Sequence, residues 1–216
     1  LWPGDPPTWV SPITDRRTAG YFLRAFSMGE HSGTHINAPA SFFDVEYDGW
    51  LSPRILPLIV IDVVDRARRC VDFIFEESDL KSVESRQGKI PSGSVVVLRT
   101  GWDRLWTDRS RFLGIDASGN MHFPSFSEGV VACLMEERGV AGVGVDTHGL
   151  DSPGDACYRN NRRILSRGGI AVECLAALDT LPLRGSWGVF APLPLIGGSG
   201  APLMVTALIP SWMRGG

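Results

Sequence analysis

The sequence predicts a single mixed α/β domain, and three features support this fold class. At 216 residues the chain has the length of one large domain. Two runs, 55–64 and 94–100, are β-branched and almost continuously apolar, as expected for strands buried on both faces. A helical pattern that begins at Ser127 is followed by a third apolar run, 140–145, so a helix leads into the sheet.

The remaining elements follow in chain order. Residues 1–18 are rich in proline and polar side chains and predict an extended N-terminal arm. The aromatic stretch 21–28 predicts a strand that leads into a segment with two histidines. Further predicted elements are a surface helix at 76–87, a short helix at 161–167, and strands at 170–174 and 203–208. No repeat or charged linker divides the chain, so residues 1–216 form one predicted domain.

The composition argues against several classes of partner. The net charge is −3, with 21 basic and 24 acidic side chains and no basic stripe, so no nucleic-acid partner is expected. The longest apolar run is too short to cross a bilayer, and no signal-peptide pattern opens the chain. Four widely spaced cysteines without a CxxC pair predict a reduced, cytoplasmic protein. Because the chain begins without methionine, native residues are expected to precede Leu1.

The segment from Gly29 to Pro39 carries the strongest chemical signal. If residues 31–37 run extended, a period of two places His31, His35 and Asn37 on one face. Imidazoles that converge in this way can ligate zinc, manganese or iron. The alternative is a pair of histidines near a turn that only make hydrogen bonds, and the spacing alone leaves both interpretations open.

This segment resembles the signature of the metal-dependent cyclase family, which includes bacterial kynurenine formamidase, isatin hydrolase and proteins tied to polyketide ring closure. The signature reads His-x-Gly-Thr-His-x-Asp-x-Pro-x-His-Phe, and the chain has His31, Gly33, Thr34, His35, Pro39 and Phe42 in register. Weaker matching blocks follow in the family's order at 2–5, 99–102, 122–124, 142–147, 150–151 and 197–202. The resemblance implies a swivelling β/β/α fold, a homodimer or homotetramer, and a small-molecule substrate.

The resemblance also assigns a metal site, residue by residue. The ligand positions fall at His31, His35, Asn37, Asn161 and Glu173. Asn37 and Asn161 stand where the family has aspartate and histidine, and their amides are weaker ligands. The resemblance therefore implies one divalent ion, zinc or manganese, held by His31, His35 and Glu173. A metal-free site is the alternative.

A third departure concerns proton transfer. The last histidine of the signature falls at Ser41, and a hydroxyl does not exchange protons near neutral pH. His122 and His148 are therefore candidate general bases, and Ser41 is the third candidate catalytic residue because it occupies the position of the family's histidine. The alternative for His148 is an exposed loop position without a catalytic role, and this is the ordinary expectation. Asp151 and Asp155 lack the spacing of a calcium loop, so a solvated turn is expected there.

The sequence thus predicts an enzyme that acts on a carbonyl-containing small molecule that is flat and ring-bearing. The resemblance implies opening of an amide, lactone or lactam, or cleavage of a formamide, with a metal that polarises the carbonyl or activates a water. The substitutions argue against ordinary arylformamidase activity. One alternative is a ring-closing cyclase of polyketide-type biosynthesis. The other is a non-catalytic descendant that binds a ligand or has a structural role.

Overall fold

The computed structural model describes residues 4–45 and 49–213, and its centre is a closed barrel of seven strands. In barrel order these are β10 (Ser186–Pro192), β11 (Gly200–Leu208), β3 (His35–Asn37), β9 (Ile170–Glu173), β8 (Gly142–Val145), β6 (Val95–Arg99) and β4 (Arg54–Asp62). β4, β6, β8 and β9 are parallel, whereas β3, β10 and β11 join the barrel antiparallel. The predicted mixed α/β class is confirmed.

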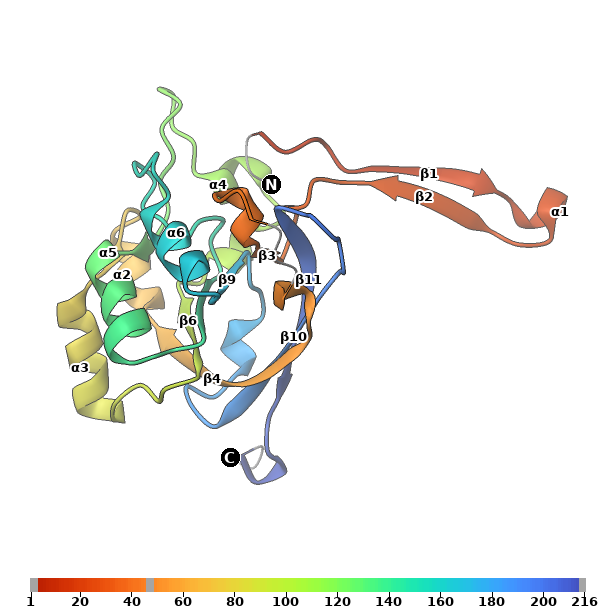
Figure 1. Cartoon of the computed structure of the whole chain (residues 1–216). Coiled ribbons are helices and arrows are strands. Elements are labelled where there is room, and N and C mark those ends of the chain that lie inside the picture. Colours follow the sequence, from red (N-terminus) through yellow and green to blue (C-terminus); the bar gives the residue numbers. More distant parts are fainter. Residues whose placement is uncertain (1–3, 46–48, 214–216) are drawn as a thin grey trace.

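Helices such as α3 (Glu77–Gln87) and α6 (Arg159–Ser166) pack on the outer side of the parallel strands, whereas α1 (Arg16–Ala19) lies away from the barrel (Figure 1). The helices are α1 (Arg16–Ala19), α2 (Val64–Arg69), α3 (Glu77–Gln87), α4 (Arg109–Leu113), α5 (Glu128–Ala132) and α6 (Arg159–Ser166). A capping box between Glu76 and Asp79 starts α3, and Gly88 follows its last residue. No helix in the described part of the chain is long and apolar enough to span a bilayer.

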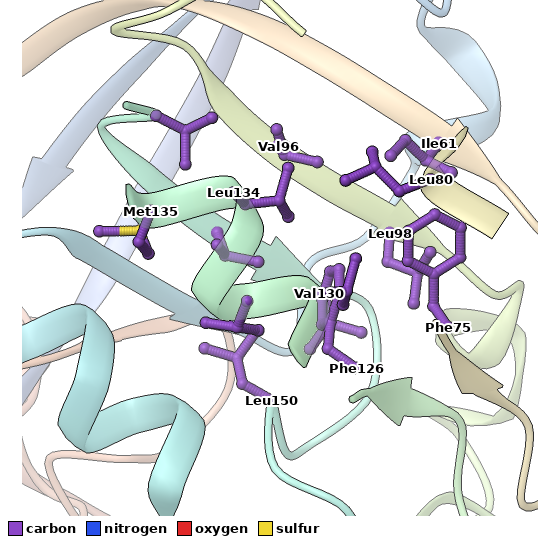
Figure 2. Close-up of a cluster of buried hydrophobic side chains, with 14 of the residues drawn as sticks. Ile61, Phe75, Leu80, Val96, Leu98, Phe126, Val130, Leu134, Met135 and Leu150 are labelled. Atoms are coloured by element: carbon purple, nitrogen blue, oxygen red, sulfur yellow. The ribbon is translucent and has the colours of Figure 1, made fainter. Parts of the chain in front are cut away.

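Two hydrophobic layers explain why the parallel strands read as continuous apolar runs. Ile59 and Ile61 of β4 face the helix layer, together with Leu80, Val130 and Leu134 of the helical segments (Figure 2). The barrel interior is filled by the alternate residues of the same strands and by their neighbours, including Leu58, Val95, Val97, Val172 and Phe190. Burial on both faces removes the polar alternation that a half-exposed strand would show.

The N-terminal region differs from its prediction. Instead of a single extended arm, this region forms a hairpin. β1 (Trp9–Thr14) pairs antiparallel with β2 (Leu23–Ser27), and the short helix α1 lies in the connection between them. This hairpin projects away from the barrel (Figure 1). The strand predicted at 21–28 is present as β2, which precedes the histidine segment as predicted but pairs within the hairpin. Residues 1–3, which begin the predicted arm and its first family block, lie outside the described residues.

A glycine sets the spacing at the centre of the sheet. A Cβ added to Gly142 of β8 would lie 2.3 Å from the carbonyl oxygen of Ile170 in β9. Because that contact is impossible, any larger residue would push these two strands apart. The close approach matters for function, since β8 leads into His148 and β9 ends at Glu173.

Candidate active site

A cavity of about 540 Å³ opens at the carboxyl ends of β8 and β9. Its lining includes polar side chains of the predicted site: His31, His35, Asn37, Ser41, His148, Asn161 and Glu173. Apolar and aromatic side chains complete the wall: Phe42, Met121, Phe123 and Tyr158. The position agrees with the general rule that ligands bind at the carboxyl ends of parallel strands.

The pairing of β3 with β9 brings the first two functional side chains together. His35 lies opposite Glu173 in the strand register. The ring atom Nε2 of His35 is 3.3 Å from Oε2 of Glu173, and Nδ1 donates to the Gly33 carbonyl at 2.8 Å. Both side chains are buried. The convergence of an imidazole with this carboxylate, which the resemblance implied, is therefore present.

His31 reaches the site by a different route from the one predicted. Gly33 has a φ of +72°, so the chain turns there and only 35–37 is strand. The His31 ring packs edge-on against His35, with centroids 5.1 Å apart. Its Nδ1 donates to Oδ1 of Asn37 at 3.0 Å, and its Nε2 lies 3.0 Å from Oγ of Ser199. The extended period of two is wrong for His31, yet the ring still joins the cluster.

Two amides connect this cluster to α6. Nδ2 of Asn37 donates to Oδ1 of Asn161 at 2.8 Å. Nδ2 of Asn161 donates in turn to Oδ2 of Asp151 at 2.8 Å and to Oε1 of Glu173 at 3.1 Å. The backbone N–H of Leu150 also donates to that Glu173 oxygen, at 3.0 Å. We call His31, Asn37, Asn161 and Glu173 the amide chain, because two amides link the imidazole to the carboxylate.

His35 and Glu173 form a buried ion pair. Burial alone would lower the pKa of His35, but hydrogen bonds to Cys174 and Glu173 outweigh it and raise the pKa to about 10. Burial alone would raise the pKa of Glu173, but the bond and charge of His35 lower it to about 2. At neutral pH the imidazolium and the carboxylate are therefore both charged.

This pair gives stability a defined pH dependence. Glu173 contributes fully above its unfolded value near 4.5 and loses its contribution as the pH falls toward 2. His35 contributes fully below its unfolded value near 6.5, and its contribution is lost as the pH rises toward 10. We expect the free energy of unfolding to fall between these last two values, by up to about 1.4 kcal/mol per pH unit.

Urea unfolding at a series of pH values measures this slope. The His35→Gln variant is the control, because without the imidazole its slope in the alkaline window should flatten. Equal slopes in the variant and the natural chain would contradict the assignment of the slope to His35.

The donor set does not fit the metal ion that the resemblance implies. A ligand atom awaiting an absent ion is expected to be left without a hydrogen-bond partner. None of the buried nitrogen or oxygen atoms that lack such a partner belongs to His31, His35, Asn37, Asn161 or Glu173. Within residues 4–45 and 49–213, no group of three or more His, Cys, Asp or Glu side chains is placed to hold a metal ion. Of the two predicted states, this arrangement favours the metal-free one.

Comparison with known proteins now decides the family. A family model named Cyclase matches residues 1–152. An isatin hydrolase of Roseibium aggregatum is 31% identical over 200 residues, which cover 85% of this chain and 73% of that protein. The chain belongs to the cyclase family.

Solved structures agree with this membership. Isatin hydrolase A of Ralstonia solanacearum is 32% identical and has a TM-score of 0.87, covering 94% of this chain and 82% of its own. An isatin hydrolase bound to the product analogue thioisatinate is 26% identical and also has a TM-score of 0.87, covering 95% of this chain and 83% of its own. The predicted family and fold are confirmed, and the chain is an enzyme of the cyclase family.

In this cyclase-family enzyme His148 is a buried wall residue. Only 3% of it is exposed, so the expectation of an exposed loop is wrong. Its Nε2 donates to the Leu113 carbonyl at 3.1 Å, and its ring packs 4.3 Å from that of Phe123. Burial lowers the pKa of His148 to about 4, so the imidazole is neutral at physiological pH. A neutral imidazole that lines the cavity can accept a proton.

The other two predicted proton-transfer positions of this family member differ from each other. Ser41 lines the cavity, and its hydroxyl donates to the Ser199 carbonyl. His122 does not line the cavity; its Nδ1 bonds to Asp72 at 2.9 Å and its Nε2 lies 3.3 Å from Asp116. These two carboxylates hold the ring at the surface and raise the pKa of His122. The structure therefore does not bring His122 to the predicted site.

Two residues of the site were missed by the sequence analysis. Asp151 is 6% exposed and accepts from Asn161, so the expected solvated turn is wrong at this position. Ser199 contacts His31, and its backbone N–H and hydroxyl both donate to Glu30. Next to it, a Cβ on Gly200 would lie 2.8 Å from Cε1 of His31. In the sequence, residues 197–202 served only as a block that matches the family, and this packing gives a physical reason for the glycine at position 200.

Proposed function

We propose that the chain is a hydrolase that opens a cyclic amide or ester in a neutral, ring-bearing small molecule. The observation that carries the proposal is the composition of the cavity. The buried His35–Glu173 pair, the neutral His148 and several aromatic side chains all line it. Pockets for small molecules combine apolar walls with a few polar groups in this way. The isatin hydrolases among its relatives support the choice of a flat, carbonyl-bearing ring.

The charge of the cavity supports a neutral substrate. Its described lining contains no lysine or arginine, whereas four carboxylates contribute: Asp5, Asp151, Asp155 and Glu173. A substrate with its own carboxylate or phosphate would be repelled by these groups, because the positive charge of His35 is already paired with Glu173. Hydrolysis of a neutral ring creates an acid, so the same repulsion would favour release of the ionised product.

The proposed reaction begins with attack of a water on the ring carbonyl. His148 takes the proton of that water as general base. The positive charge of His35 stabilises the negative charge that develops on the carbonyl oxygen. The ring C–N or C–O bond then breaks, and the leaving nitrogen or oxygen takes the proton from His148. The product carries a carboxylic acid and an amine or alcohol, while Ser41 and His31 bind the substrate.

Replacing His148 with glutamine is expected to lower kcat by about 10²- to 10⁴-fold, because glutamine keeps a hydrogen-bonding group but cannot accept a proton. The readout is ring opening followed by absorbance, with isatin as the first probe. The acidic limb of the kcat/KM profile should lie near the lowered His148 pKa of about 4.

The matched control is His122→Ala, which removes an imidazole held outside the cavity and should leave kcat unchanged. If His148→Gln retained full turnover while His122→Ala lost it, the assignment of the base would be overturned.

A panel of bicyclic lactams, lactones and aryl formamides separates this proposal from its alternatives. Turnover of a lactam or lactone supports the hydrolase. Dehydrative closure of the corresponding open acids, without measurable opening, would support a ring-closing cyclase. Tight binding of these compounds without turnover in either direction would support a non-catalytic binding protein.

The four free cysteines favour a reducing compartment, and we propose the cytoplasm.

We further propose that the functional form is a homodimer or a homotetramer. The projecting hairpin exposes the apolar side chains of Trp9, Val10, Ile13, Leu23 and Phe26, the last of which is 65% exposed. The outer face of β4, β10 and β11 exposes a second apolar group: Ile55, Trp187, Met204 and Leu208. Contiguous apolar surface of this kind marks protein contacts. The hairpin of one copy packing on the barrel face of another would cover both surfaces.

Replacing Phe26 with aspartate is expected to shift the assembly to monomers, because a charge would have to be buried in the contact. Light scattering after gel filtration measures the mass. Arg86→Glu on α3 is the control, since it changes charge away from both apolar surfaces. If Phe26→Asp left the mass of the assembly unchanged, the proposed hairpin contact would be refuted.

A further inference from the structure

We infer that the amide chain holds this active site together in place of a divalent ion, and that Asn37 and Asn161 are the two residues that make the site metal-free. The inference deepens the proposed function, because it concerns how the same cavity is organised. It rests on the direction of each hydrogen bond in the chain and on the burial of its members.

Every link of the amide chain runs from a nitrogen to an oxygen. His31 Nδ1 donates to Asn37 Oδ1, and Asn37 Nδ2 donates to Asn161 Oδ1. Asn161 Nδ2 then donates to Glu173 Oε1. An amide has one accepting and one donating end, so two amides in series pass this polarity along without conflict. The chain is therefore complete without any added cation.

The hydrogen bonds of the amide chain matter for stability because its members are buried. Asn37 is 5% exposed, Asn161 is 4% exposed and Glu173 is 6% exposed. A polar group buried at that depth costs free energy unless it is paired. The link between Asn37 and Asn161 supplies that pairing from within the protein. A carboxylate at position 37 would instead set oxygen against oxygen at Asn161, and only a proton or a cation could relieve that contact.

Asp151, a second buried carboxylate beside Glu173, supports the assignment of Asn161 as a residue that replaces the metal ion. Its Nδ2 group is shared between Asp151 and Glu173, at 2.8 and 3.1 Å. Two buried carboxylates close together normally require a positive charge between them. Here the amide hydrogens of Asn161 contact both carboxylates, and the Nε2 atom of His35 lies 3.3 Å from the second Glu173 oxygen. Both oxygens that could attract an ion to this place are therefore already hydrogen-bonded.

The experiment measures metal binding directly, without turnover. The natural chain, purified without chelator and dialysed, is analysed for total metal, and its Tm is recorded with zinc, with manganese and with EDTA. We expect no stoichiometric metal and no shift in Tm. A retained equivalent of metal, or a fall in Tm with EDTA, would overturn the inference.

The converse variant is Asn37→Asp combined with Asn161→His, which exchanges the amides for a carboxylate and an imidazole. Both new groups are strong ligands, and both stand beside His31, His35 and Glu173. With zinc at about a hundred times its Kd, the Tm of this variant should rise by about 5–10 °C. Ser85→Asp on the exposed side of α3 adds a carboxylate away from the cavity; it is the control and should gain no shift.

Two further results complete the test. If the double variant does not fold without metal, the single variant Asn37→Asp should still show a Tm that rises with zinc. A folded double variant that binds no metal would refute the role assigned to the amides. A metal-free natural chain without any turnover would leave this inference standing and would count only against the proposed hydrolase.

Discussion

Replacing Glu173 with alanine is expected to lower the free energy of unfolding by about 3–5 kcal/mol at neutral pH, because it leaves a buried imidazolium without its partner. His35 is 3% exposed, and its Nε2 lies 3.3 Å from the Glu173 carboxylate. The same change removes the acceptor for the Leu150 N–H and for the Asn161 amide. Urea unfolding followed by circular dichroism measures the loss.

The control for this prediction is Glu128→Ala. Glu128 pairs with Arg163 at 3.2 Å, but its side chain is 50% exposed. Surface pairs of this kind contribute less than about 1 kcal/mol. Equal losses in the two variants would contradict the assignment of a buried ion pair at Glu173. A double variant, His35→Gln with Glu173→Gln, should be less destabilised than the sum of the two single changes, because it removes both charges together.

Replacing Asp146 with alanine should cost about 3 kcal/mol or more, because several backbone donors would lose their acceptor inside the protein. Asp146 is fully buried at the end of β8. Its carboxylate accepts from the backbone N–H groups of Thr100 and Gly101 at 2.7–3.0 Å and from the Thr100 hydroxyl at 2.6 Å. Thermal or urea unfolding measures the loss.

The Asp146 prediction extends to the cavity. The segment that Asp146 holds carries Trp102, whose indole donates to the Phe112 carbonyl at 2.8 Å, and Phe112 packs against His148. Near-ultraviolet circular dichroism should therefore change as well. Asp146→Asn, which keeps one accepting oxygen, should lose less stability. Asp179→Ala, at an exposed pair with Arg104, is the control, and a loss as small as its own would refute the prediction.

The fold could be predicted where burial is strong on both faces. β4, β6 and β8 show as continuous apolar runs because helices cover one face and the barrel interior covers the other. β10 was missed because its apolar stretch is short, with Gly188 near its start and Pro192 at its end. β1 and its pairing with β2 were missed because the proline-rich sequence of the first strand is typical of a loop.

The site could be predicted where its residues lie close together in sequence, or where the family resemblance supplies a distant position, as it does for Asn161 and Glu173. His31, His35 and Asn37 fall within seven residues, so their spacing and the family resemblance identify them. Ser199 and Asp151 reach the site only through barrel closure and the packing of α6. No local pattern indicates those contacts. The direction of the Asn37–Asn161 bond is likewise a tertiary property, which is why sequence left the metal question open.

The position of β3 has a consequence for how the chain is made. This short strand lies between β9 and β11, with Ala38 N–H bonded to the Ser199 carbonyl and Leu203 N–H to that of Thr34. During synthesis on the ribosome the histidine segment emerges early, but both of its neighbours are translated much later. Until β9 leaves the exit tunnel β3 has two unpaired edges, and until β11 follows it has one, so the nascent chain is exposed to aggregation. The candidate active site is thus among the last parts of the protein to form.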